Sequence, residues 1–322
     1  MTASQEHPAY FIKLMSEVIP MAPLIITAPH SIQDVKDAKD ITLDELKHDY
    51  QLLIDFDALT NKNKFCGNPI IYNYQMTNLL NCRRGSKNYR TLEEELSDPK
   101  LNAKLWAETL QRNRRDKAPV PCATDLYECH RLNRGAIVPF KSSTAKYIYK
   151  RYGATNVLDP TAGWGGRLLG ASSLGIKYTG LDTNLNLRDG YNRMIKDLNI
   201  KNCDMFYEDC LTFPFEIIDP DLILTSPPYS NVEIYEYMEG WDNDDHFYKS
   251  FMIPLFKKID EETHCPVCIN ISPKMYKTLI KKYDVRKCDE SIDLRQQGKK
   301  QYKTKSQHYI YVWHPTDNIL MK

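Results

Sequence analysis

Apolar and polar positions recur with two different periods along the second half of the chain. From about residue 155, short apolar runs typical of strands alternate with longer stretches that have the spacing of amphipathic helices. Strands and helices that alternate in this way are joined by right-handed crossovers and form a mostly parallel sheet. The pattern predicts a doubly wound α/β domain whose ligand crevice lies at the carboxyl ends of the strands. The strand-like runs are TNVLDP, YTGLDT, CDMFYEDC, DLILTSPPY, CPVCINIS and QHYIYVWH.

The first part of the chain lacks this regular alternation. It contains isolated apolar runs such as PLIITAP, an acidic candidate helix and several basic loops, without an internal repeat. We therefore expect a mixed or helical appendage at residues 1–135 and the catalytic α/β domain at residues 136–322. The boundary between them is expected near Arg134 to Lys141.

A glycine-rich turn follows the first predicted strand, in VLDPTAGWGGRLLGA at 157–171. Gly163, Gly165 and Gly166 permit positive φ angles and let a ligand approach the backbone at the amino end of the next helix. The spacing is not GxGxxG, because Leu168 stands where the third glycine would fall, and a GxxxxGK[ST] loop is missing. Nicotinamide and nucleoside triphosphates are therefore disfavoured as ligands of this turn.

Acidic residues end the first three predicted strands. Asp159 ends the first, Asp182 the second, and Glu208–Asp209 the third. An acid about twenty residues after such a turn commonly accepts hydrogen bonds from a ribose, and Asp209 is a candidate partner for an adenine amino group. One such acid is more often a turn residue or a helix cap. Three acids in one crevice favour a ligand site.

The fourth predicted strand, DLILT, ends abruptly in the prolines of TSPPY at 225–229. Two consecutive prolines cannot donate backbone hydrogen bonds and hold φ near −65°, so they stop a sheet ladder and stiffen the chain. A lone SPPY is most often an ordinary strand-terminating turn. Its place downstream of the glycine turn favours a functional motif.

Together these stretches resemble the S-adenosylmethionine-dependent amino-group methyltransferases that act on nucleic-acid bases. The resemblance covers roughly residues 137–315: DPTAGWGG is similar to the family's DPFxGxGT motif, and TSPPY to its catalytic [DNS]PP[YF] motif. Thr161 and Trp164 depart from the usual residues, and the motif order resembles the gamma arrangement. The resemblance implies a Rossmann-like class I methyltransferase fold and S-adenosyl-L-methionine as cofactor. The cofactor-binding residues that it implies are Phe140, Asp159, Pro160, Ala162, Gly163, Gly165, Asp182, Asp209 and Thr225.

The TSPPY motif has the groups that amino methylation needs. The lone pair of an exocyclic amino group is delocalised into the base, so the nitrogen must be pyramidalised and aligned with the methyl donor. The Ser226 side chain and the Pro227 carbonyl can each accept one amino hydrogen bond, and the prolines fix that carbonyl. Tyr229 can stack on an extruded base. The implied catalytic residues are Ser226, Pro227, Pro228 and Tyr229.

Serine before the prolines resembles the cytosine-N4 branch, whereas adenine-N6 enzymes more often have Asp or Asn there. We therefore favour cytosine N4 of DNA, with adenine N6 of DNA or a base of RNA as alternatives. A protein-glutamine methyltransferase generally has NPPY, which Ser226 disfavours, and the intact motifs disfavour a non-catalytic nucleic-acid-binding protein. The Pro121–Cys122 dipeptide lies upstream of the glycine turn, the wrong order for a carbon-5 cytosine methyltransferase.

The overall charge does not point to a partner, because 43 Lys and Arg balance 42 Asp and Glu to a net charge of +1. Local clusters of basic residues do point to a nucleic-acid partner, since they could neutralise its phosphates. Residues 281–305, for example, hold nine basic and four acidic residues. The candidate nucleic-acid-binding residues are Arg83, Arg84, Lys87, Arg90, Arg112, Arg114, Arg115, Lys299, Lys300, Lys303 and Lys305.

The nine cysteines lie mostly in apolar stretches, which is typical of reduced thiols. Cys265 and Cys268 form a CxxC, but a second CxxC is missing, so we expect core thiols rather than a metal site. The chain shows neither a signal sequence nor an apolar run long enough to cross a bilayer. We therefore expect a soluble, cytoplasmic protein that does not bind membranes.

Overall fold

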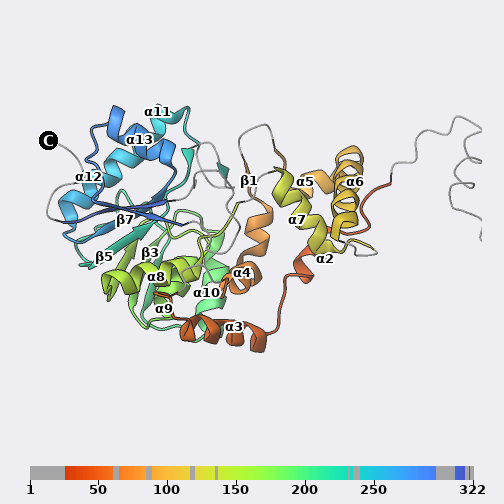
Figure 1. Cartoon of the computed structure of the whole chain (residues 1–322), viewed down its shortest axis with the longest axis horizontal. Coiled ribbons are helices and arrows are strands. Elements are labelled where there is room, and N and C mark those ends of the chain that lie inside the picture. The colour runs from red at the N-terminus through yellow and green to blue at the C-terminus, as the bar shows by residue number, and fades with distance from the viewer. Residues whose placement is uncertain are drawn as a thin grey trace, which may run out of the picture.

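The computed structural model describes residues 26–60, 65–84, 89–116, 120–134, 137–230, 233–234, 240–294, 309–315 and 319. These residues form a sheet domain with helices on both faces and a group of helices that extends from one side of it (Figure 1). Within these ranges, no helix is both long and apolar enough to cross a membrane.

The core of the molecule is a seven-stranded sheet in the order β4-β3-β2-β5-β7-β9-β8. The first five strands are parallel, and β9 is antiparallel to both of its neighbours. This Rossmann-like arrangement, with one reversed strand near the edge, confirms the class I methyltransferase fold that the sequence predicts. The strands are β2 (Asn156–Asp159), β3 (Lys177–Leu181), β4 (Cys203–Phe206), β5 (Leu222–Thr225), β7 (Val267–Ile271), β8 (Glu290–Asp293) and β9 (Tyr309–Trp313).

Helices cover both faces of this sheet, so its central strands are apolar at consecutive positions. In β5, Leu222 and Leu224 pack into the core on one face, and Ile223 packs into the core on the other. The first face is covered by α8 (Ser142–Tyr152), α9 (Gly166–Ser172) and α10 (Leu187–Asp197), and the second by α11 (Asp244–Phe247), the π-helical η3 (Tyr248–Met252), α12 (Ile253–Glu262) and α13 (Pro273–Lys282) (Figure 1).

Two helices from the N-terminal part, α3 (Leu43–Asp55) and α4 (Asn68–Leu80), pack into the core of the first sheet face. Buried Lys146 of α8 donates from Nζ to the backbone carbonyls of Leu53 and Ile54, at 2.7 Å each, where α3 ends. Helix α4 lies so close to α10 that a Cβ at Gly190 would lie 2.6 Å from the Tyr74 carbonyl oxygen. These contacts make α3 and α4 part of the support of the sheet.

The remaining helices of the N-terminal part form the group on the right of Figure 1, around a smaller apolar core that includes Met76 and Leu80 of α4. Arg134 joins this group by ion pairs of 2.7 Å to Glu95 and to Glu108. Helix α4 therefore connects the two cores. The helices of the group are α2 (Ile32–Asp37), α5 (Leu92–Ser97), α6 (Pro99–Asp116) and α7 (Ala123–Arg134).

A two-stranded ribbon pairs segments that are far apart in the chain. β1 (Arg83–Arg84) follows α4 and is antiparallel to β6 (Glu233–Ile234), which begins shortly after Tyr229. The chain that follows the TSPPY motif is therefore hydrogen-bonded to a basic segment of the N-terminal part.

Candidate functional site

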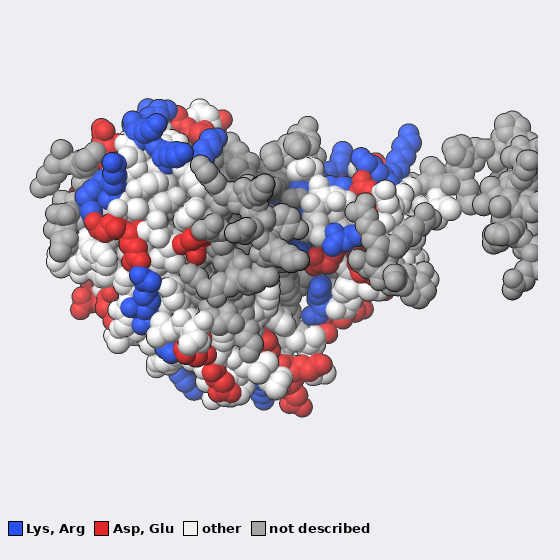
Figure 2. Space-filling model, in the orientation of Figure 1, with Lys and Arg blue, Asp and Glu red and all other residues white. Residues whose placement is uncertain are grey.

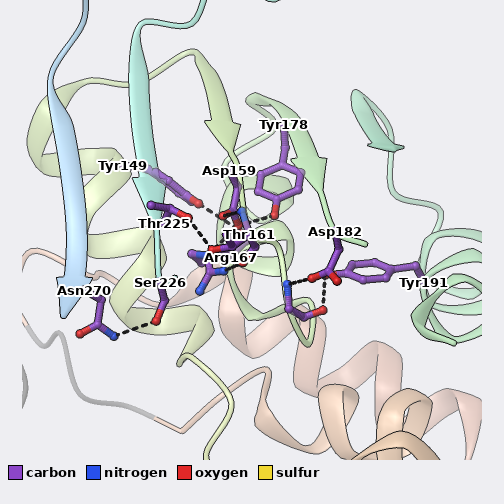
Figure 3. A network of polar contacts seen from close by, with 11 residues as sticks. Tyr149, Asp159, Thr161, Arg167, Tyr178, Asp182, Tyr191, Thr225, Ser226 and Asn270 are labelled. Atoms are coloured by element: carbon purple, nitrogen blue, oxygen red, sulfur yellow. Dashed lines mark hydrogen bonds and ion pairs between the residues drawn. The ribbon is translucent and has the colours of Figure 1, made fainter. Parts of the chain in front are cut away.

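The carboxyl ends of four parallel strands bring the predicted motifs to one edge of the sheet. The glycine turn follows β2, Asp182 follows β3, Tyr207 and Asp209 follow β4, and TSPPY ends β5. Figure 3 shows side chains from three of these strand ends close together, with Asn270 of β7 beside them. The sheet order makes this crevice the topological switch point, where α/β folds bind ligands.

Gly163 and Gly165 of the glycine turn adopt left-handed φ angles of 60° and 95°. A Cβ at Gly163 would lie 3.9 Å from Arg167 Nη2 and from the Thr161 carbonyl oxygen, an ordinary contact distance, so the backbone of this glycine is not closely packed. A Cβ at Gly166 would lie 1.9 Å from the Phe140 carbonyl oxygen. The turn thus has one open glycine and one packed glycine, and Gly165 caps α9 between them.

A buried ion pair holds the glycine turn in shape. The fully buried Asp159 carboxylate accepts hydrogen bonds from Arg167 Nε at 2.6 Å and from the Tyr178 hydroxyl at 2.7 Å. Arg167 also donates to the Thr161 carbonyl, and its guanidinium lies 5.1 Å from the centre of the Phe140 ring. Asp159 therefore fixes the turn from inside, while its predicted contact with a cofactor stays a prediction.

Two further residues of the turn are buried in the same connection. Pro160 follows β2 and is buried, and the backbone N–H of Ala162 donates to the Leu181 carbonyl at 2.8 Å. That bond joins the turn to the end of β3, next to Asp182. This hydrogen bond therefore holds the glycine turn at a fixed distance from Asp182.

Asp182 lies against the backbone of Gly163 in the glycine turn. Its carboxylate accepts hydrogen bonds from the backbone N–H groups of Gly163 at 2.8 Å and of Asn184 at 2.9 Å. Burial nevertheless raises the pKa of Asp182 to about 6, because desolvation of the carboxylate outweighs these two bonds. The Tyr191 hydroxyl donates to the Gly163 carbonyl at 2.8 Å and fixes the other side of the same peptide.

Tyr207, the first residue after β4, is a site residue that the sequence did not single out. Its hydroxyl is buried and has no hydrogen-bond partner among the described residues. Burial raises the pKa of Tyr207 to about 12, and the Arg188 guanidinium lies 4.8 Å from its ring centre. Asp209, by contrast, is exposed, and its carboxylate accepts the Leu211 N–H at 2.9 Å within a turn.

The TSPPY segment is anchored where it leaves β5. The buried Thr225 hydroxyl lies 2.7 Å from the Thr161 hydroxyl, which links the strand end to the glycine turn. Ser226 is half-buried, and Asn270 Nδ2 lies 3.5 Å from Ser226 Oγ. Pro227 is buried and Pro228 half-buried. The strand end, the serine and the first proline are therefore held in one place.

The segment is anchored again just beyond its tyrosine. Tyr229 packs against the core of the second sheet face. Ser230 has a left-handed φ of 38°, and its hydroxyl donates to Asp244 of α11 at 2.9 Å. A non-glycine residue in this region is strained and persists only where its surroundings hold it. The Asp244 bond supplies that hold and fixes the direction in which the chain leaves Tyr229.

The structure locates only some of the predicted nucleic-acid-binding side chains. Arg83, Arg90 and Arg112 are exposed, and within the described part of the chain no ion pair involves them. Figure 2 shows basic side chains over the helical group and, on the same face, over α13. The backbones of Arg84, Arg114 and Arg115 are described but their side chains are not, and Lys87, Lys299, Lys300, Lys303 and Lys305 lie outside the described residues.

A pocket next to the β1–β6 ribbon collects several of these arginines. Arg83 and Arg90 line it with Arg131 and Arg134 of α7. The two α7 arginines are already paired, Arg131 with Glu128 at 2.6 Å and Arg134 with its two glutamates. Among the described residues that line this pocket, the cationic groups that remain for a ligand are those of Arg83 and Arg90.

The crevice has the groups that an adenosine-containing cofactor requires. The accessible backbone at Gly163, the Asp182 carboxylate and the Tyr207 hydroxyl, which has no partner among the described residues, come from three successive strand ends. A bound ribose offers hydroxyl donors to a carboxylate, and a buried hydroxyl without a partner gains a hydrogen bond when a polar ligand reaches it. The residues present therefore fit S-adenosylmethionine.

No family model and no curated protein matches this chain. It is similar to a candidate class I S-adenosylmethionine-dependent methyltransferase from Listeria monocytogenes, with 13% identity and a TM-score of 0.43 over 86% of this chain and 90% of that one. An rRNA methylase from Streptococcus thermophilus has 11% identity and a TM-score of 0.37 over 56% of this chain and 100% of that one. A SAM-dependent methyltransferase from Neisseria gonorrhoeae has 14% identity and a TM-score of 0.36 over 55% and 69%.

The candidate cofactor and substrate sites are inferred from the geometry of the crevice itself. The strand order and the single reversed strand establish the fold as a Rossmann-like class I methyltransferase domain with a helical N-terminal part.

Proposed function

We propose that this protein transfers a methyl group from S-adenosylmethionine to the exocyclic amino group of a DNA base, with cytosine N4 as the favoured acceptor. The observation that carries the proposal is the position of Ser226 to Tyr229 at the end of β5, in the same crevice as the open glycine turn and Asp182. The hydroxyl pair between Thr225 and Thr161 links the two halves of that site directly.

On this proposal the cofactor half of the crevice holds and orients the methyl donor. Asp182 accepts hydrogen bonds from the ribose hydroxyls. The Tyr207 hydroxyl, which has no partner among the described residues, forms a hydrogen bond with a polar group of the cofactor. Gly163 leaves room for close approach of the methionine end. S-adenosylmethionine supplies a methyl group on a sulfonium centre, which makes the methyl carbon electrophilic.

The catalytic half prepares the amino nitrogen. The Ser226 hydroxyl and the Pro227 carbonyl accept hydrogen bonds from the two N–H groups of this nitrogen, which draws its lone pair out of conjugation with the ring. Buried Pro227 is rigid, so its carbonyl needs no reorganisation as positive charge develops on nitrogen. Tyr229 stacks on the base once it has left its helix. A carbon–nitrogen bond forms as the carbon–sulfur bond breaks, S-adenosylhomocysteine leaves, and the nitrogen loses one proton to water.

The choice of base and polymer rests on narrower observations. Serine before the prolines resembles the cytosine-N4 branch and supports cytosine over adenine. The exposed Arg83 and Arg90 near the ribbon support a polyanionic partner, and phosphates of DNA or RNA would both suit them. We take DNA as the substrate, so RNA methylation is a distinct outcome of the test.

The test is transfer of labelled methyl from S-adenosylmethionine to DNA and RNA, followed by nucleoside digestion and mass spectrometry. N4-methylcytosine in DNA is the expected product. N6-methyladenine in DNA would overturn only the choice of base, and label solely in RNA would overturn the choice of polymer. Label solely in protein, or no transfer at all, would overturn the proposal.

The raised pKa of Asp182 predicts that cofactor binding depends on pH. Above a pKa of about 6 the carboxylate is ionised and accepts hydrogen bonds strongly, whereas below it the protonated group is a poorer acceptor. We expect the Kd for S-adenosylmethionine to rise about tenfold per pH unit below that pKa. Calorimetric titration between pH 5 and 8 measures the effect, and Asp182→Asn should remove it while weakening binding throughout.

The exposed Asp189, which is paired with Arg193 on α10, provides the matched control. Asp189→Asn should retain both the affinity and the pH dependence of the unmodified protein. A pH dependence that survives in Asp182→Asn would show that another group controls cofactor binding.

Arg83 is expected to contact a phosphate of the substrate. Arg83→Ala should weaken DNA binding several-fold at low salt and reduce the slope of log K against log salt by about 1, because one phosphate contact is lost. Lys257→Ala on α12, which removes an exposed lysine paired with Glu261, should leave the slope unchanged. Fluorescence anisotropy over a range of salt concentrations measures both, and equal slopes for the two variants would contradict the contact.

A further inference from the structure

Asn270 of β7 lies beside Ser226 because of the register of two parallel strands. Thr225 of β5 is paired with Ile269 of β7, so Ser226 and Asn270 occupy the next level, just where both strands reach the crevice. Figure 3 shows the two side chains side by side at this edge, with the Asn270 NH2 group turned toward the serine. Nδ2 of Asn270 lies 3.5 Å from Ser226 Oγ.

The other end of the Asn270 carboxamide is unsatisfied. Its Oδ1 atom is buried and has no hydrogen-bond partner among the residues that the structure describes. A buried acceptor without a partner costs about 1–3 kcal/mol, and native proteins keep few of them. An unpartnered acceptor beside the serine of a substrate-binding motif is therefore a candidate for a group that the substrate satisfies.

The chemistry of Ser226 leaves a place for such a group. A serine hydroxyl is short and carries one hydrogen and two lone pairs, and one of those lone pairs faces Asn270 Nδ2. A carboxamide oxygen is a stronger acceptor than a hydroxyl and reaches further from the backbone. A half-turn about the last side-chain bond exchanges the positions of the carboxamide oxygen and nitrogen. Asn270 can thus offer an acceptor at the level of Ser226.

We propose that the Asn270 carboxamide contacts the target base, and that its oxygen accepts a hydrogen bond from the amino group that is methylated. This inference rests on the proposed function and adds a catalytic residue to it. The amino group has two N–H bonds, so the Pro227 carbonyl accepts one, and Ser226 and the Asn270 oxygen share the other in a three-centre hydrogen bond.

The test compares Asn270→Leu, which keeps the approximate size but removes the acceptor, with Asn270→Asp, which keeps an acceptor. Single-turnover methyl transfer to DNA at saturating cofactor should fall about 100-fold in Asn270→Leu, the usual effect of removing one polar group at a reacting centre. Asn270→Asp should retain much more activity, and its rate should increase with pH as the new carboxyl ionises. The Kd for S-adenosylmethionine should stay within about twofold of that of the unmodified protein in both variants, because no cofactor contact changes.

Ser291→Ala, at an exposed position of the edge strand β8, is the control and should transfer at the unmodified rate. If the unmodified protein methylates DNA and Asn270→Leu is as fast, the inference falls and the proposed function stands. The inference also falls if Asn270→Asp is as slow as Asn270→Leu, or if both variants lose cofactor binding, since Asn270 would then be structural. If the unmodified protein transfers no methyl group to a base amino group, both proposals fall.

Discussion

Ser226→Ala and Tyr229→Ala should each lower methyl transfer strongly while leaving S-adenosylmethionine binding largely intact. Ser226→Ala removes an acceptor for the amino group, and we expect a loss of about 100-fold or more in the single-turnover rate. Tyr229→Ala removes a stacking surface worth about 1–3 kcal/mol, which weakens base binding by about 10- to 100-fold. Transfer of tritiated methyl to DNA measures both losses, and calorimetry measures cofactor affinity.

The two losses should also differ in kind. Ser226 acts on the reacting nitrogen, so its removal should lower kcat, whereas loss of the Tyr229 ring should raise KM for DNA as well. Ser291→Ala on β8 again serves as the control, since its side chain is exposed at the sheet edge. Full activity in both variants would mean that the TSPPY segment is only a strand-terminating turn, and the proposed site would be wrong.

The sheet could be predicted from the sequence because its determinants are local. Each central strand is a short apolar run bounded by acidic, glycine or proline residues, and the connections β2–β3, β3–β4 and β5–β7 contain helices. Parallel strands put all of their carboxyl ends on one edge, so Asp159, Asp182 and Ser226 had to meet once the order was Rossmann-like.

The partners of these residues could not be predicted, because they depend on contacts between distant side chains. Arg167 reads as an ordinary helix residue, yet it is buried against Asp159 and fixes the turn. Its position in an otherwise apolar helix start, GRLLGA, was the one available signal, since a charge buried there needs a partner. Tyr207 and Asn270 carry no motif, and only their unpartnered buried atoms reveal them.

The N-terminal part shows a second limit. Helices α3 and α4 precede the α/β pattern by many residues and carry no β-α alternation, yet they pack into the core of the first sheet face. Through Gln75 and Asn78, α4 donates hydrogen bonds to the carbonyls of Leu187 and Asn186, in the connection that follows Asp182. That a target-recognition region occupies residues 1–135 stays a prediction, but α4 itself supports the proposed cofactor site.

The glycine turn gives the sharpest prediction about stability. Gly166→Ala would put a Cβ 1.9 Å from the Phe140 carbonyl oxygen and 3.3 Å from Ile71 Cδ1, so backbone must move. Overpacking of this kind costs about 3 kcal/mol, which for a chain of this size lowers Tm by about 4–5 °C. Thermal unfolding followed by circular dichroism measures the change.

Substitutions at two other glycines distinguish the effect of close packing from the effects of backbone strain and of ligand binding. Gly175 has a φ of 68° with no atom within 4 Å of a Cβ position, so Gly175→Ala should lose only the roughly 1 kcal/mol of left-handed strain. Gly163→Ala has similar strain at a φ of 60° and should be about as stable, but it should lose affinity for S-adenosylmethionine because a cofactor that lies against the Gly163 backbone would meet the new Cβ. If Gly166→Ala were no less stable than Gly175→Ala, the close packing of α9 against Phe140 would be wrong. If Gly163→Ala bound the cofactor normally, the open face of the turn would not be the binding surface.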